Sequence, residues 1–164
     1  MQAYLNFIDS LVELVNSSAK EKQQHTAISI CRNLYPFYKK LVTDNTSISL
    51  ISNAIDFCEQ EFSKSAVNIA RVDELIADVE KLMPSTADIQ TWDEGYIINA
   101  VSAVLELLMF TKDSNNQHLV EICSIMIDNV DFELSEANDD ITDDQIYEHH
   151  RMLSTMDQIN GMLK

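Results

Sequence analysis

The sequence predicts an all-α protein, with one domain over residues 1–164 folded as a bundle of about seven helices. Three observations support this prediction. The chain has only two glycines and two prolines, whereas an average chain of 164 residues holds about eleven glycines. Hydrophobic residues make up 46% of the chain, enough for a core without metals or disulfides. They recur at helical spacing, and so few chain-breaking residues favour long helices with short connections.

Four helices are expected in the first half of the chain. Apolar periodicity places them over about 2–16, 21–42, 47–62 and 69–83. In the first helix, Val12 belongs to the apolar stripe with Leu11 and Val15. Pro36 should end or kink the second helix, because proline lacks a backbone N–H and clashes with the preceding turn. Pro84 should stop the fourth helix.

The fifth helix, over about 92–111, is predicted to be the central buried helix because it is apolar on most of its circumference. A capping box begins it, in which Thr91 and Glu94 satisfy free backbone amides reciprocally. Gly95 lies in the first turn, where its lack of a side chain would let a neighbouring element approach closely.

Two further helices are expected after residue 115. The sixth runs over about 116–134. The seventh begins at a second capping box, Thr142 with Gln145, and continues to about Asn160. Gly161 is expected to cap its C-terminal end.

The charge of the chain is strongly negative and unevenly distributed. The net charge is −16, and residues 83–164 contain sixteen acidic residues and three basic ones. Such a surface repels phosphate backbones and anionic membranes, so neither nucleic acid nor membrane is an expected partner. A basic protein is the partner that this charge favours.

The acidic residues are densest in DFELSEANDDITDDQIYEHH, residues 131–150. Two of them, Asp143 and Asp144, lie in the first turn of the seventh helix, where acids stabilise the helix dipole. Asp131, Glu133 and Glu136 lie near the end of the sixth helix, where negative charge is unfavourable, so we expect them to serve recognition. The residues expected to bind the partner are Asp131, Glu133, Glu136, Asp139, Asp140, Asp143, Asp144, Glu148, Trp92, Asp93 and Glu94.

No motif for catalysis, a cofactor or a metal site is found. The four histidines form no HExxH pattern, and the acidic stretch lacks the glycine and the ligand spacing of a calcium loop. Cys31, Cys58 and Cys123 fall on apolar stripes and are expected to pack as reduced thiols in the core. The aromatic and basic run Tyr35 to Lys40 is interpreted as packing around a kinked helix. We therefore expect a non-enzymatic, cytoplasmic protein without metal or cofactor.

Three segments carry a resemblance to a known family. They are CRNLYP with the upstream pair His25-Thr26, VDELIADVEKLMP, and TWDEGYIINAVSAVLEL. Over about residues 25–130 the chain resembles the YjaG-like family of small bacterial helical proteins. The resemblance implies an all-helical fold and no established activity. The long C-terminal region of that family looks shortened here, and the acidic stretch lies outside the part that matches.

Two functions are consistent with these features. The first is an immunity or inhibitor protein that neutralises a basic partner, such as a bacterial nuclease toxin, by occluding its active cleft. The alternative is a housekeeping helical protein, forming a homodimer, whose acidity serves solubility.

Overall fold

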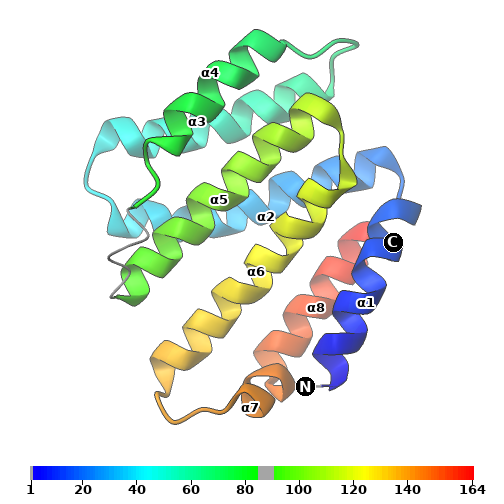
Figure 1. Ribbon diagram of the computed structural model, residues 1–164, viewed down its shortest axis with the longest axis vertical. Helices are drawn as coiled ribbons and strands as arrows, with labels where there is room; N and C mark the ends of the chain where they lie inside the picture. Colours follow the sequence, from blue (N-terminus) through cyan, green and yellow to red (C-terminus); the bar gives the residue numbers. More distant parts are fainter. Residues whose placement is uncertain (1, 85–90) are drawn as a thin grey trace.

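The computed structural model describes residues 2–84 and 91–164, and within these ranges the chain is all-α (Figure 1). The described residues form eight helices and no strand. The helices are α1 (Gln2–Ser17), α2 (Lys20–Leu41), α3 (Asn45–Phe62), α4 (Ile69–Glu80), α5 (Trp92–Asp113), α6 (Asn116–Ala137), α7 (Asp143–Glu148) and α8 (His150–Leu163). The all-α prediction is confirmed.

Helix α5 is central, as its composition predicts. It contacts α2, α3, α4 and α6, while α1 and α8 lie together on the other side of α2 and α6 (Figure 1). Val101, Val104, Leu107 and Leu108 on α5 are almost fully buried. Among the described helices, α5 alone is long and apolar enough to cross a membrane, but 61% of its apolar window is buried inside the fold. A core helix has the same composition.

The three cysteines lie in the core as free thiols. The Cys31 Sγ–H donates to the carbonyl of Ala103 at 3.3 Å, which ties α2 to α5. Burial raises the pKa of Cys58 and of Cys123 to about 12 and raises that of Cys31 as well. The prediction that all three pack as small hydrophobic residues is confirmed.

Pro36 does not end α2, so that part of the prediction was wrong, while the predicted kink stays a prediction. The helix runs through the proline to Leu41. The carbonyl affected by the missing N–H is that of Arg32, and both residues lie on the exposed side of the helix, where water can reach it. On the opposite side, Leu34 and Tyr38 are buried on either side of Pro36 and hold the helix against the core.

The predicted seventh helix is divided in two at His149. This residue has an extended backbone (φ −67°, ψ 138°), and its Nδ1 accepts a hydrogen bond from the Arg151 backbone N–H at 3.2 Å. The imidazole therefore caps α8 where the sequence predicts continuous helix. The prediction that Gly161 ends α8 was wrong. The helix continues to Leu163, whose side chain is buried.

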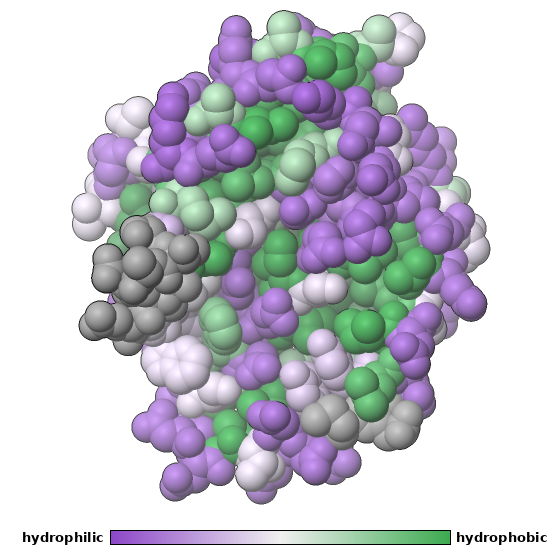
Figure 2. Space-filling view, in the orientation of Figure 1, coloured by the Kyte–Doolittle hydropathy of each residue, from purple (hydrophilic) through white to green (hydrophobic). Residues whose placement is uncertain are grey.

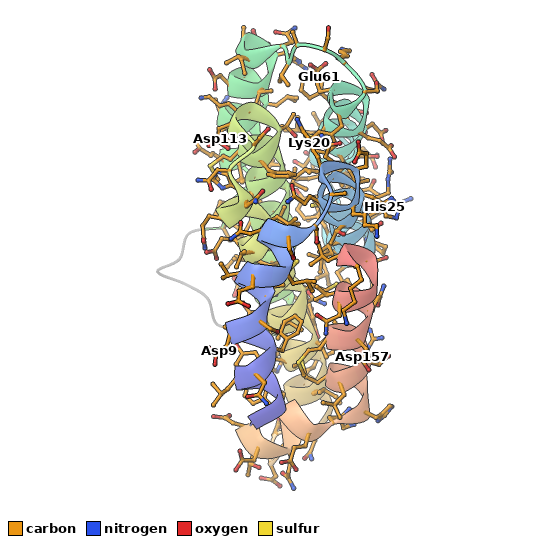
Figure 3. All side chains as sticks on the ribbon, turned by 90° about the vertical axis from the view of Figure 1, so that its right-hand side faces the viewer. Asp9, Lys20, His25, Glu61, Asp113 and Asp157 are labelled. Carbon is orange, nitrogen blue, oxygen red and sulfur yellow. The ribbon has the colours of Figure 1, made fainter. Side chains whose placement is uncertain are left out.

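Helix α1 buries a narrower face than its sequence predicts. Leu11 and Val15 are fully buried, whereas Val12 is 44% exposed. Figure 3 shows why: α1 and α8 lie side by side at the surface, so only one side of α1 faces the core.

Candidate functional site

The helical hairpin α5–α6 brings together two groups of candidate residues that are about 40 positions apart in sequence. Ser114 turns the chain between the helices with a left-handed backbone (φ 56°). The antiparallel helices then place the start of α5 beside the end of α6. Gly95 lies against the ring of Phe132, because a Cβ added to Gly95 would stand 2.5 Å from Phe132 Cε2. The predicted close approach at Gly95 is confirmed.

The start of α5 is fixed by the predicted capping box. The Thr91 hydroxyl accepts from the Glu94 backbone N–H at 3.3 Å, and the Glu94 carboxylate accepts from the Thr91 N–H at 3.1 Å. The Glu94 carboxylate thus stabilises the start of α5, and its contact with a partner stays a prediction. Trp92 is 40% exposed and meets the edge of Phe132 with ring centroids 5.8 Å apart.

A pocket of about 280 Å³ opens where α2, α5 and α6 meet, and we call it the acidic pocket. Its lining residues are Phe37, Lys40, Leu41, Asp93, Tyr96, Glu133 and Glu136. Three carboxylates from two helices thus surround one cavity, together with one lysine. Asp93, Glu133 and Glu136 are all among the predicted partner-binding residues.

Tyr96 joins the two acidic helices inside the acidic pocket. Its hydroxyl donates to Glu136 Oε2 at 2.8 Å, and its ring stacks on Phe37 with centroids 5.2 Å apart and planes at 19°. Burial, followed by the hydrogen bond and charge of Glu136, raises the pKa of Tyr96 far above its ordinary value. The tyrosine is therefore a hydrogen-bond donor at neutral pH and no base.

Next to the acidic pocket lies a smaller cavity of about 50 Å³, the inner recess, which shares Phe37 and Glu133 with it. Asn129 lines the inner recess and is only 2% exposed. Its Nδ2 donates to Glu133 Oε1 at 3.2 Å, whereas its Oδ1 has no hydrogen-bond partner among the described residues. Arg151 Nη2 reaches Glu133 Oε2 at 3.3 Å from α8.

These contacts correct one prediction. Asp131, Glu133 and Glu136 lie near the end of α6, as predicted, but each has a structural partner. Glu136 accepts from Tyr96, Glu133 from Asn129 and Arg151, and Asp131 from the Ser135 hydroxyl at 3.2 Å. These acids therefore have a structural role that the sequence did not indicate, and their role in recognition stays a prediction.

The remaining predicted acids lie outside the acidic pocket. Asp139 and Asp140 are exposed in the turn after α6, while Asp143, Asp144 and Glu148 are exposed on α7. The predicted capping box at Thr142 is present. Figure 2 shows hydrophilic side chains at this lower end of the molecule, where α6 ends and α7 lies. These acids form an exposed charged surface, and none of them lines the acidic pocket.

Asp131 belongs to a different environment from the acidic pocket. Burial and the charge of Asp143 raise its pKa, against the opposing effect of the Ser135 hydrogen bond. Nearby, the ring of Tyr4 on α1 stacks on the ring of Tyr147 on α7, with the ring centroids 4.2 Å apart. Burial and the charge of Asp131 raise the pKa of Tyr147 to about 12.

These residues offer charged and hydrogen-bonding groups to a ligand. The described part of the chain holds no group of three or more His, Cys, Asp or Glu side chains arranged to take a metal ion. His118 is half-buried between Glu106 and Asp113, with its Nδ1 2.7 Å from Glu106 Oε2 and its Nε2 3.3 Å from Asp113 Oδ2. Both ring nitrogens of His118, on α6, thus contact carboxylates of α5, so the imidazole joins α5 to α6.

Sequence reasoning missed half of the acidic pocket. Phe37 and Lys40 belong to the run of α2 that was interpreted as packing, and Leu41 and Tyr96 were not expected in any site. Asn129 carried a usable signal: it is a polar residue between the buried Ile127 and Val130 of α6. A polar side chain at such a position requires a partner.

The comparisons with known proteins agree with the fold. A family model described as a protein of unknown function (DUF416) matches residues 11–164, so the match includes the acidic stretch that the sequence resemblance left out. A crystal structure of a DUF416 family protein from Shewanella baltica OS155 has a TM-score of 0.75 and 20% sequence identity, covering 93% of this chain and 81% of that one. No curated protein matches the chain. The chain belongs to the DUF416 family, a family of helical proteins of unknown function.

Proposed function

We propose that this protein is a non-catalytic binding protein that recognises a basic protein through its acidic end. The observation that carries the proposal is the acidic pocket, where Asp93, Glu133 and Glu136 converge from two helices. Exposed acids of the α6–α7 turn and of α7 extend the negative surface beside it. Complementary charge speeds the encounter of two proteins and selects against acidic partners.

In its specific form, the proposal is an immunity or inhibitor protein acting on a nuclease toxin. A nuclease needs a basic cleft to hold phosphates, so an acidic protein can occupy the same cleft and exclude the nucleic acid. The mechanism is steric and electrostatic occlusion, and it requires no reaction on either protein. We propose a cytoplasmic location and, within DUF416, a place among the YjaG-like proteins, on the segments that resemble them.

The experiment is capture followed by rescue. Affinity purification from the native host should retain a basic protein in a complex that salt weakens, and co-expression of this chain should rescue cells that express the captured protein. Replacing Asp139, Asp140, Asp143 and Asp144 by Lys should weaken capture more than it lowers the melting temperature. The control replaces the exposed Asp9 and Asp157, on the surface of α1 and α8 in Figure 3, by Lys as well, and it should leave capture unchanged. Failure to rescue would refute inhibition.

A second candidate function, a housekeeping homodimer, is favoured by three exposed apolar side chains on α1 and α8. Leu5 and Val12 of α1 and Leu153 of α8 are 45%, 44% and 38% exposed. They lie on the helices that flank a groove of about 390 Å³ (Figure 3). Leu153→Glu should then convert a dimer to a monomer in analytical ultracentrifugation. A wild-type chain that sediments as a monomer at all concentrations contradicts this candidate.

A further inference from the structure

We propose that the acidic pocket and the inner recess together bind the guanidinium group of an arginine side chain on the partner. This inference rests on the proposed function and specifies the group that is recognised. It depends on four observations: the carboxylates, the aromatic wall, the unpartnered amide oxygen of Asn129, and the chain's own Arg151.

The charge in the pocket favours a cation. Asp93, Glu133 and Glu136 line it, and Lys40 is the single basic residue of the lining. Glu136 is exposed and receives one hydrogen bond, from Tyr96, to its Oε2. An ionised carboxylate can accept several hydrogen bonds on its two oxygens. Two carboxylates of the pocket, Asp93 and Glu136, therefore have acceptor capacity for an incoming donor group.

The buried amide of Asn129 requires a donor. Its Oδ1 is a buried acceptor with no partner among the described residues, which costs free energy unless a donor reaches it. An anion cannot satisfy it, because an anion brings only acceptors. A cation with several N–H groups can donate to this oxygen and to the neighbouring carboxylates together.

The shape and the aromatic lining favour guanidinium over ammonium. The half-buried ring of Phe37 forms a wall shared by the acidic pocket and the inner recess. A guanidinium is planar, is more weakly hydrated than an ammonium, stacks on aromatic faces and presents five donors. An ammonium offers three donors from one point and keeps its water more strongly.

The chain already provides an example of this recognition. Arg151 places Nη2 3.3 Å from Glu133 Oε2 at the rim of the inner recess, with 54% of its side chain exposed. One guanidinium thus contacts the site from outside without filling the acidic pocket. The partner's arginine would enter from the side of Asp93 and Glu136.

The test uses the full chain and three defined probes. The probes are the tripeptide acetyl-Gly-Arg-Gly-amide and its lysine and citrulline analogues, where citrulline has nearly the shape of arginine without its charge. Amide chemical shifts of the isotope-labelled protein should move at residues 93–96 and 133–136 with the arginine probe, and titration should give a dissociation constant. The citrulline probe should bind at least about tenfold more weakly, since charge-assisted hydrogen bonds are lost.

Variants locate the site. Asp93→Asn combined with Glu136→Gln should weaken the arginine probe about tenfold or more. Asp9→Asn combined with Asp157→Asn removes the same charge from the exposed surface of α1 and α8 and should leave its binding nearly unchanged. Thermal melts must first show that both double variants fold. Equal binding of the citrulline or lysine probe, shifts that map elsewhere, or equal loss in both double variants would overturn the assignment.

The outcome separates this inference from the proposed function. If a captured basic partner still binds and is neutralised while the arginine probe does not reach the pocket, only the guanidinium assignment fails. If the arginine probe binds as expected but no basic protein is captured or neutralised, the proposed function fails and the binding site remains.

Discussion

Replacing Gly95 by Ala tests the contact that sets the spacing between α5 and α6. An added Cβ would stand 2.5 Å from Cε2 and 2.9 Å from Cδ2 of Phe132, closer than atoms in contact can lie. The Phe132 ring must therefore move. Its edge contacts with Trp92 and Tyr96, with centroids 5.8 and 6.2 Å away, resist that movement.

Two opposing effects decide how much Gly95→Ala changes the free energy of unfolding. Alanine is favoured over glycine inside a helix by up to about 1 kcal/mol. Overpacking a fitted contact costs about 1–3 kcal/mol. We therefore expect Gly95→Ala to lower the free energy of unfolding by about 1 kcal/mol, measured by urea denaturation followed by circular dichroism.

The sign should reverse when the obstacle is removed. In a Phe132→Ala background the space is open, so Gly95→Ala should raise the free energy of unfolding by up to about 1 kcal/mol. Gly161→Ala is the matched control, because no described atom lies within 4 Å of a Cβ there, and it should be neutral or stabilising in both backgrounds. An effect of Gly95→Ala that is the same with and without the Phe132 ring would refute the reasoning.

Three further predictions concern buried and titrating groups. The hydrogen bond from Lys64, followed by the one from the Asn68 backbone N–H, lowers the pKa of Glu61. The ionised Glu61 therefore stabilises the fold above the pKa it has in the unfolded chain, and this stabilisation is lost as the pH falls through its pKa in the folded protein. Glu61→Gln should lower the urea midpoint at pH 7 and much less at pH 3. The pKa of Asp131 is raised, mainly by burial, so its ionised form opposes folding above the unfolded pKa of about 3.9. Asp131→Asn should stabilise the protein at pH 7 by no more than about 1 kcal/mol because solvent screens the site, and a gain that persists at pH 3 would contradict this cause. The three buried thiols should resist a thiol reagent at pH 8 until urea unfolds the chain, as their raised pKa values and burial imply; fast labelling of the native protein would contradict it.

The acidic pocket could be predicted from the sequence only in part. Asp93, Glu133 and Glu136 stand out by charge, but no local pattern places the start of α5 beside the end of α6. Their convergence depends on the antiparallel packing of the two helices. Phe37 and Lys40 lie on α2, more than 50 residues away in sequence from Asp93, and no local pattern relates them to it.

Local rules also failed where burial opposed them. Pro36 predicts an end or a kink in α2, and Gly161 predicts an end to α8, yet both helices continue past these residues. In each case buried side chains beyond the breaker, Tyr38 and Leu163, hold the chain in the helix. The break at His149 could not be predicted, because histidine is common inside helices. It begins α8 here only because its ring accepts a hydrogen bond from the Arg151 backbone N–H.

The sequence by itself determined the all-α class, the buried central helix and both capping boxes. These features depend on hydrogen bonds and apolar spacing between residues a few positions apart, which a linear pattern contains. The tertiary structure alone decided that residues of three helices line one acidic pocket and that Asn129 lines the inner recess. The physical reason is that helix register follows from side-chain packing across the interface, as Gly95 against Phe132 illustrates, and that fit exists only after the helices meet.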